Sequence, residues 1–274
     1  MQLANGLIRL RLRAGLTQEQ VGQRADYGKS TVSRYEDWRN PAGIRARTAR
    51  SLAEACGATP AEAETLARLA EDTTEVWQVD GAVPSWLNPL VSLEHNARYE
   101  DAFAPSCVPG LLQTRAYALA IHQAEDVRRP AKAVERAVDA RMQRQQVLRR
   151  DSPLQLRTVL DQAVFQRVVG NSAVMAEQIG HLIEQAAQPN IDIQILPFTS
   201  GAAAAGLGHF VTLVGADASL TSVYAELLGG GLYLDAPEDV DRYRSAFEGL
   251  RGHALSTAES LKIMMTTRKE YGDG

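Results

Sequence analysis

Hydrophobic residues recur at the spacing of an α-helix in five short runs at the start of the chain. The first run ends at Gly15, a residue type that readily takes the left-handed conformation after a helix. Thr17 and Gln20 form a capping-box pattern before the second run, and Thr59 and Glu62 form another before the fifth. The pattern therefore predicts five helices, beginning near residues 3, 17, 29, 44 and 59, in one compact unit.

The third predicted helix, residues 29–37, has two chemically different sides. Val32 and Tyr35 are three residues apart and are expected to face the core. Asp26-Tyr27-Gly28 precedes this helix and predicts a tight turn in which Gly28 takes a positive φ angle. The opposite side of the helix presents the hydrogen-bond donors Lys29, Ser30, Ser33 and Arg34.

The pattern changes after residue 72. Residues 73–85 contain tryptophan and proline and favour a linker, and Leu90 to Phe103 then returns to helical spacing. Further helices are expected over residues 131–150, 172–185 and 238–251. Alternating or β-branched runs predict strands over residues 154–160, 191–198, 209–214 and 222–228.

These elements predict two domains. Residues 1–72 form a mainly α domain, and residues 86–274 form an α+β domain with a small mixed or antiparallel sheet. In the long helix expected at residues 131–150, the apolar positions Val134, Val138 and Met142 should face inward. Its basic residues should face outward, as a solvated face or as a second contact with DNA: Arg141, Arg144, Arg149 and Arg150.

Charge is distributed unevenly along the chain. Residues 1–58 carry a net charge of +5, whereas residues 59–274 carry −9. A basic end on an acidic body attracts polyanions to that end, although charge alone does not separate nucleic acid from an acidic protein. No apolar run approaches the roughly 18 residues of a membrane span, so a cytoplasmic protein is expected. Cys56 and Cys107 lack the spacing of a metal site, and neither metal nor cofactor is expected.

Residues suited to acid–base chemistry are present, but they form no catalytic motif. Glu226, Asp235, His209 and His253 could assemble into such a site, and Gly229-Gly230-Gly231 suggests a phosphate loop. The residues after the glycines resemble a strand and not a helix N-terminus, and no GxSxG or HExxH pattern occurs. We therefore expect no enzyme activity and no catalytic residues.

The segment SGAAAAGLG, residues 200–208, connects two predicted strands and consists of small residues. It is a plain connection, or alternatively a lid or a loop that docks a partner. In the second case Pro197, Phe198 and His209 would line the site.

The segment LTQEQVGQRADYGKSTVSRYE, residues 16–36, resembles the helix-turn-helix of the Xre/Cro/C1-type phage-repressor family. The resemblance covers residues 3–70 and implies that the third helix enters the major groove of double-stranded DNA. Arg34 and Lys29 would then reach guanine O6 and N7. It also implies an Arg11–Glu36 bridge between the first and third helices. The residues implied to contact DNA are Gln18, Lys29, Ser30, Thr31, Ser33 and Arg34.

Two positions depart from the family pattern. Asp26-Tyr27-Gly28 replaces the usual Gly-x-Ser, and Trp38 stands where a small or basic residue is common. Gly28 supplies no hydroxyl cap, so the third helix is expected to begin less firmly.

The later segments VPGLLQT, LDQAVFQRVVG and VYAELLGGGLYLD look like the C-terminal domain of actinobacterial regulators that carry an Xre helix-turn-helix. That group includes the WhiJ-like developmental regulators and the Scr antitoxin-like regulators. The resemblance implies a homodimeric transcription regulator on a palindromic operator, a repressor or an activator, whose body binds a small partner protein or a small ligand. The alternative is an antitoxin-like protein that sequesters a small partner and regulates its own synthesis. Residues 255–265 either pack across the two-fold axis or cover their own sheet.

Overall fold

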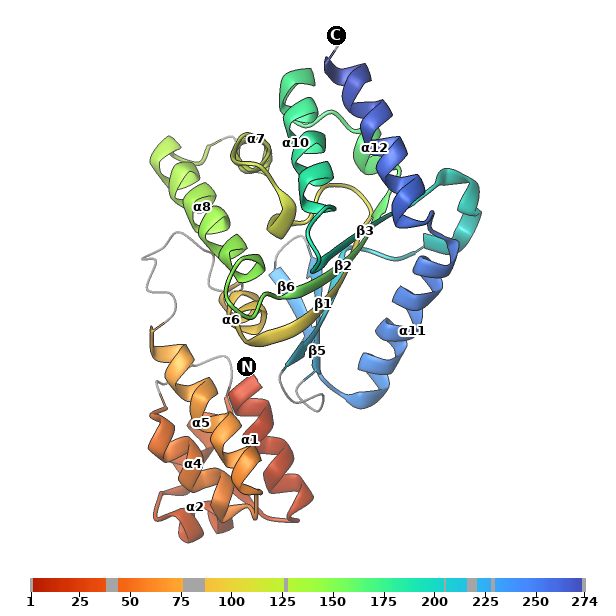
Figure 1. Cartoon of the computed structure of the whole chain (residues 1–274). Helices are drawn as coiled ribbons and strands as arrows, with labels where there is room; N and C mark the ends of the chain where they lie inside the picture. Colours follow the sequence, from red (N-terminus) through yellow and green to blue (C-terminus); the bar gives the residue numbers. More distant parts are fainter. Residues whose placement is uncertain are drawn as a thin grey trace. The chain divides into compact units, whose positions relative to one another are not determined.

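The computed structural model describes residues 2–37, 44–75, 87–125, 128–204, 206–215, 221–227 and 230–272. Contacts divide these residues into two compact units (Figure 1). The first unit holds the described residues up to 75 together with residues 88–96, and the second holds Leu87 and the residues from 97 onward. Residues 73–75 of the expected linker are helical, and residues 76–85 lie outside the described residues.

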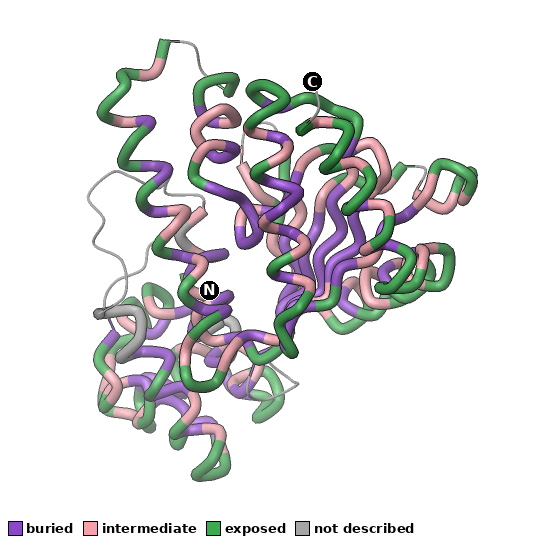
Figure 2. Tube along the Cα trace, turned by 45° about the horizontal axis from the view of Figure 1, so that its top comes forward, coloured by how far each residue is buried: buried purple, intermediate pink, exposed green. Residues whose placement is uncertain are grey.

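The first unit is helical, and its first five helices are the predicted ones. Leucine and valine side chains on their inner faces form its core, with Leu7, Val21, Val32 and Leu52 each at most 3% exposed. Purple segments in Figure 2 mark the buried stretches of these helices. The helices are α1 (Gln2–Arg13), α2 (Gln18–Ala25), α3 (Lys29–Glu36), α4 (Ala46–Ala55), α5 (Pro60–Glu75) and α6 (Asn88–Asn96).

The turns of this unit confirm one expectation and correct another. Gly15 has a φ of 67°, as its place after α1 predicts. Gly28 has a φ of −73°, so the expected positive φ there is wrong. Asp26 takes that role instead, with a φ of 62°, because a short polar side chain tolerates the left-handed region. Gly28 is the N-cap of α3 and makes no side-chain capping bond, as expected.

The second unit contains a six-stranded mixed sheet in the order β3-β2-β1-β4-β5-β6. β1 and β3 both pair parallel to β2, whereas β4, β5 and β6 are added in antiparallel pairs. An α+β unit with a mixed sheet is therefore confirmed. The strands are β1 (Ala97–Ala104), β2 (Gln155–Asp161), β3 (Ile191–Leu196), β4 (Phe210–Gly215), β5 (Thr221–Leu227) and β6 (Gly230–Leu234).

The central strand β1 was not predicted. Helical spacing from Leu90 to Phe103 suggested one helix, but the helix ends at Asn96 and a strand begins at Ala97. Alanine, glutamate and aspartate are uncommon in strands, yet Glu100, Asp101 and Ala102 are all buried here. Pairing with β2 on one side and β4 on the other overrides the local preference of this segment.

Helices cover both faces of the sheet, with α11 (Pro237–His253) on one face and α7, α8 and α10 on the other (Figure 1). Phe247 and Leu250 of α11 pack with Phe103, Val159 and Phe210 of the sheet. The remaining α-helices are α7 (Arg115–Glu125), α8 (Ala131–Arg144), α9 (Ala163–Gln166), α10 (Ser172–Gln185) and α12 (Thr257–Gly272). Among the described helices, none has the length and apolar content needed to cross a bilayer.

α8 is shorter than expected, and two of its arginines have a different environment. A 3-10 turn from Gln145 to Leu148 follows the α-helix. Val134 and Val138 are buried, as predicted. Arg144 is only 8% exposed and Arg141 is half-buried, so the expectation that both face solvent is wrong. The α-helix ends at Arg144, and this places both guanidinium groups against the segment that follows β1.

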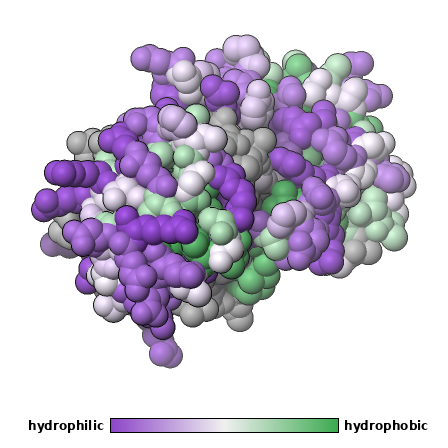
Figure 3. Space-filling view, turned by 90° about the horizontal axis from the view of Figure 1, so that it is seen from below, coloured by the Kyte–Doolittle hydropathy of each residue, from purple (hydrophilic) through white to green (hydrophobic). Residues whose placement is uncertain are grey.

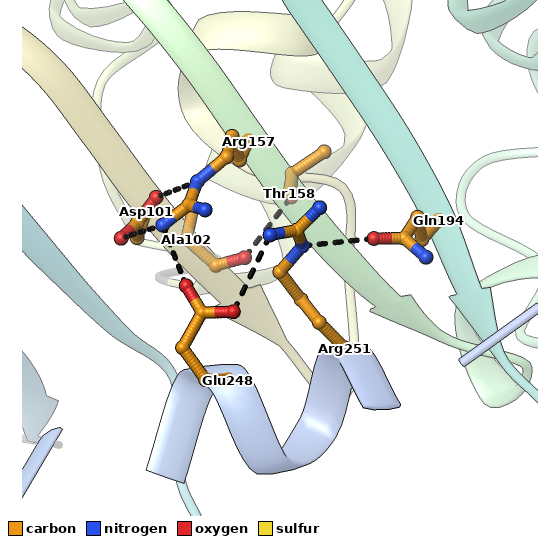
Figure 4. A network of polar contacts seen from close by, with 7 residues as sticks. All are labelled: Asp101, Ala102, Arg157, Thr158, Gln194, Glu248 and Arg251. Carbon is orange, nitrogen blue, oxygen red and sulfur yellow. Dashed lines mark hydrogen bonds and ion pairs between the residues drawn. The ribbon is translucent and has the colours of Figure 1, made fainter. Parts of the chain in front are cut away.

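A network of polar side chains joins the sheet to α11 (Figure 4). Arg157 of β2 donates two hydrogen bonds of 2.6 Å to Asp101 of β1 and forms a 3.0 Å ion pair with Glu248 of α11. Arg251 of α11 donates to Gln194 of β3 at 3.0 Å. These contacts orient α11 across three neighbouring strands.

Candidate nucleic-acid interface

A close turn joins α2 to α3, and Gly22 makes it possible. The N–H of Asp26 and the N–H of Tyr27 both donate to the carbonyl oxygen of Gly22. A Cβ atom on Gly22 would lie 2.5 Å from the carbonyl oxygen of Tyr27, which is too close for any side chain. The sequence analysis assigned no role to Gly22. Its position inside a helix, where glycine is unfavourable, is the signal that could have identified it.

The capping box at the start of α2 is confirmed. The Thr17 hydroxyl accepts from the Gln20 N–H at 3.2 Å, and the Gln20 side chain accepts from the Thr17 N–H at 2.8 Å. Gln18 follows directly and extends from the first turn of α2 toward α3, where its Nε2 donates to Glu36 Oε2 at 2.8 Å. The cap therefore places Gln18 where it can brace the end of α3.

Glu36 is the point where the first three helices are joined. It is 7% exposed and accepts from Arg11 Nε at 2.7 Å and from Arg11 Nη2 at 2.9 Å, in addition to Gln18. Arg11 also donates to the carbonyl oxygen of Leu16 at 3.2 Å. The hydrogen bonds to Glu36 raise the pKa of Arg11, so the guanidinium remains charged. A two-pronged, largely buried pair of this kind fixes the orientation of α3 relative to α1.

The outer face of α3 presents donors to solvent. Lys29, Ser30, Ser33 and Arg34 are exposed, and Thr31 is half-buried. The Arg34 guanidinium lies 5.3 Å from the centre of the Tyr35 ring, which extends the arginine along the helix surface. Within the residues that the structure describes, neither Lys29 nor Arg34 forms an ion pair. Both cations are therefore available to an anionic or acceptor-rich ligand.

The dimensions of α3 fit the major groove. Eight helical residues extend over about 12 Å, and the groove of B-form DNA is about 12 Å wide. Arginine and lysine can donate to guanine O6 and N7, and serine hydroxyls can donate to phosphates or base edges. The arrangement can thus combine base contacts with phosphate contacts.

Two further basic residues belong to the same surface. Arg45 and Arg47 are exposed at the start of α4. The hydroxyl of Thr48, in the same turn of α4, lies 3.2 Å from the Tyr27 hydroxyl, so this turn adjoins the turn between α2 and α3. Both arginines lie in this turn, and neither was expected from the sequence to contact DNA. Figure 3 views the molecule from the end where α2 and α4 lie in Figure 1, and hydrophilic side chains cover much of that face.

The residues expected to line a site around residues 200–208 belong to two different strand ends. Pro197 and Phe198 follow β3, whereas His209 precedes β4, and strands β2 and β1 lie between β3 and β4 in the sheet. Phe198 is 54% exposed, and His209 lies 3.3 Å from Glu226 of β5. Pro197 and Phe198 therefore lie beside the end of β3, and His209 lies beside the start of β4, with two strands between them.

Only part of the acid–base group considered above comes together. His209 and Glu226 are neighbours, whereas the Nδ1 atom of His253 lies 2.8 Å from the carbonyl oxygen of Gly249 on α11. A Cβ atom on Gly231 would lie 2.1 Å from the Tyr224 ring, so this glycine serves the packing of β6 on β5. The described residues contain no group of three or more His, Cys, Asp or Glu side chains suited to a metal ion.

Two family models match the chain. Residues 2–66 match the helix-turn-helix domain, in agreement with the geometry of α2 and α3. Residues 87–266 match the domain of unknown function DUF5753. The chain belongs to the DUF5753 family. No match was found among curated proteins or among solved structures.

The matches support a DNA-binding regulator with a second, distinct domain. The DUF5753 match begins at residue 87, so it includes α6, although α6 packs with the helical unit. The helix-turn-helix match agrees with the Xre-like character of the first unit.

Proposed function

We propose that the protein is a sequence-specific DNA-binding transcription regulator whose helix α3 enters the major groove. The observation that supports this most directly is the outer face of α3, where Lys29 and Arg34 are exposed and form no ion pair within the described residues. Arg34 and Lys29 contact base edges, and Ser30, Thr31 and Ser33 contribute hydroxyl donors. Gln18 braces α3 and lies at its phosphate-facing side.

The decisive experiment is footprinting with the full chain, on sites taken from genome-wide occupancy in the native host. The variants Lys29→Ala and Arg34→Ala should lose selective protection of these sites. Arg68→Ala is the matched control, because Arg68 is an exposed arginine of α5 in the same unit. Equal protection by all four proteins would refute the assignment of α3.

We infer that the regulator acts as a homodimer on a palindromic operator. One short recognition helix makes few base contacts, and two-fold operators in such systems place half-sites about 34–36 Å apart. The apolar face of α12 is mainly used within its own unit, since Met264 is fully buried and α12 packs along α10. This favours the second of the two roles considered for residues 255–265.

Edge strand β6 is the better candidate for the dimer contact. Leu227 of β5 and Leu232 of β6 are 58% and 44% exposed at this edge. The opposite edge, β3, is already covered, because Ile195 accepts from the N–H of Leu255 and donates to Ser260 Oγ. Two β6 strands related by a two-fold axis would extend the sheet antiparallel. Light scattering should show a dimer for the full chain and a monomer for Leu232→Lys; a wild-type monomer on a bound, non-palindromic site would overturn the dimer.

The second unit is proposed to sense a small ligand or a small partner protein in the cytoplasm, as in the WhiJ-like and Scr antitoxin-like regulators. A pull-down separates this regulator from the antitoxin-like alternative. Stoichiometric capture of a small protein that changes operator binding favours the antitoxin-like function. A change in operator binding produced by a metabolite alone favours the sensing regulator.

A further inference from the structure

The strand order of the second unit reverses beside β1. The chain passes from β1 to β2 and β3 on one side, and then crosses the sheet to β4 on the other side of β1. In open parallel α/β sheets, ligands commonly bind beyond the carboxyl ends of the strands at such a reversal, and β1 and β2 form a parallel pair here. β1 ends at Ala104, and the segment that follows contains the VPGLLQT sequence, whose Gln113 is 3% exposed. No function described so far uses this segment.

Two arginines of α8 converge on this segment. A Cβ atom on Gly110 would lie 2.8 Å from Arg144 Nη2 and 3.7 Å from Arg141 Nε. Glycine at this position therefore leaves space for both guanidinium groups beside the backbone. Gln145 fixes the same backbone by donating to the carbonyl oxygens of Gly110 and Gln113 at 2.9 and 2.8 Å.

Arg141 faces a neutral partner. Its Nη1 donates to Gln113 Oε1 at 2.8 Å, and it forms no ion pair with any residue that the structure describes. Burial, followed by the charge of Arg144, lowers the pKa of Arg141 to about 10, which leaves the guanidinium charged at neutral pH. Removing a charged guanidinium from water is unfavourable unless an anion compensates it.

The carboxylates nearest to this cation are held by histidines. Glu226 Oε2 lies 3.3 Å from His209 Nδ1, and Glu125 Oε2 lies 2.9 Å from His122 Nδ1. Hydrogen bonding to the histidines is the largest cause of the lowered pKa of both glutamates, so both are ionised at neutral pH. They influence Arg141 through space, but neither neutralises it by direct contact.

We propose that Arg141 and Arg144, which converge beside Gly110, bind the oxyanion of a small molecule. The planar fork of a guanidinium matches the oxygens of a carboxylate or a phosphate, and Arg144 places a second guanidinium next to that of Arg141. Glu226 and Glu125 then disfavour ligands that carry further negative charge next to the bound group. The site belongs to the second unit alone and does not depend on DNA binding.

The test is titration of the full chain with inorganic phosphate in one arm and acetate in the other, followed by calorimetry and by the arginine Nε–Hε resonances. A minimal anion is expected to bind with a dissociation constant on the order of millimolar. The arm that binds identifies the ligand as a phosphorylated or a carboxylated molecule. In wild type the Arg141 resonance, assigned by its loss in Arg141→Gln, should shift on binding.

Four variants make the result specific. Arg141→Gln should weaken binding at least tenfold while keeping an amide beside Gln113, and Gly110→Ala should weaken it several-fold by displacing Arg144. Arg136→Gln should bind like wild type, because Arg136 is an exposed arginine of the same helix. Lys29→Ala should also bind like wild type, which excludes the DNA-binding face as the anion site.

Failure of both anions to bind, or equal binding by Arg141→Gln and wild type, would overturn the proposal and leave the DNA-binding assignment intact. Unfolding of Arg141→Gln would be detected by circular dichroism, and the Gly110→Ala result then decides alone. If the full chain binds the anion but protects no operator, only the proposed regulator function is refuted.

Discussion

Each unit contains, among its described residues, a two-pronged ion pair whose carboxylate is largely buried, and the two pairs differ in what supports them. In the helical unit, Arg11 and Glu36 are 15% and 5% exposed in their side chains. In the sheet unit, Arg157 and Asp101 are 35% and 12% exposed. Glu36 has Gln18 as its additional partner, whereas Arg157 also pairs with Glu248 and lies over the Phe247 ring.

The difference predicts how the stability of each unit changes when the carboxylate of its ion pair is removed. Without Glu36, the half-buried Arg11 keeps only the carbonyl of Leu16 among its described partners. Without Asp101, Arg157 keeps Glu248, and α11 remains attached by the Phe247 and Leu250 packing. The position of α3 in the helical unit should therefore depend mainly on the Arg11–Glu36 pair. In the sheet unit, several contacts hold α11 in place.

Glu36→Ala should produce the largest loss of stability. Breaking a buried ion pair costs about 3–5 kcal/mol, because an uncompensated cation remains. Urea unfolding followed by circular dichroism should show a weakened first transition and an unchanged transition for the sheet unit. Glu54→Ala, an exposed acid of the same unit, is the control. A shift no larger than that of the control would contradict the bridge.

Asp101→Ala should cost less, although its carboxylate is more buried than the guanidinium it binds. We expect a loss of about 1–3 kcal/mol, because a charged hydrogen-bond partner is removed while Arg157 retains Glu248. The double variant Asp101→Ala/Glu248→Ala should lose more than the two single losses combined. If the losses of unfolding free energy are strictly additive in the same urea measurement, Asp101 and Glu248 contribute independently of each other.

Arg34→Ala should leave the stability of both units unchanged and weaken only the binding of DNA. A lost bidentate base contact costs about 1–3 kcal/mol of binding free energy. Lys29→Ala should behave in the same way, since both side chains are exposed on α3. Competition between specific and unrelated DNA measures the effect, with thermal unfolding as the stability check. Weakened binding to all sequences equally would reassign these cations to phosphates.

The smallest effect is expected from Arg13, which links α1 to Glu62 at the start of α5. The hydrogen bonds from Arg13 lower the pKa of Glu62 to about 2. A folded-state pKa below the unfolded one stabilises the protein above the unfolded value, and this contribution is lost as the pH falls toward 2. Arg13→Ala should therefore be slightly less stable than wild type at pH 7, and this difference should become smaller as the pH is lowered to 2. A stability difference of the same size at pH 7 and pH 2 would show that Arg13 acts through packing and not through Glu62.

The helical unit was largely predictable because its signals are local. Thr17 and Gln20 cap α2 within one turn, and Gly15 ends α1 by its own backbone preference. Asp26 is the exception, since it took the left-handed position expected of Gly28. Either residue can adopt that conformation, and the bonds to Gly22 decide between them.

The sheet unit was predictable in four of its strands and not at its centre. β2, β3, β4 and β5 coincide closely with β-branched runs, whereas β1 has the composition of a helix and was expected to be one. Arg141 and Arg144 were expected on the surface because helical spacing alone cannot show what the end of α8 meets. The segment after β1 meets them there, through Gly110.

The sequence by itself determined the first five helices of the first unit, the caps and glycine that delimit several of them, and the donor face of α3, because each depends on residues within a few positions. Only the tertiary structure decided that residues 97–104 form the middle strand. Their partners lie more than fifty residues away, with Asp101 opposite Arg157 and Thr212. Pairing with β2 and β4 gives this segment backbone hydrogen bonds on both sides. Their stabilising effect exceeds the weak preference of these residues for a helix.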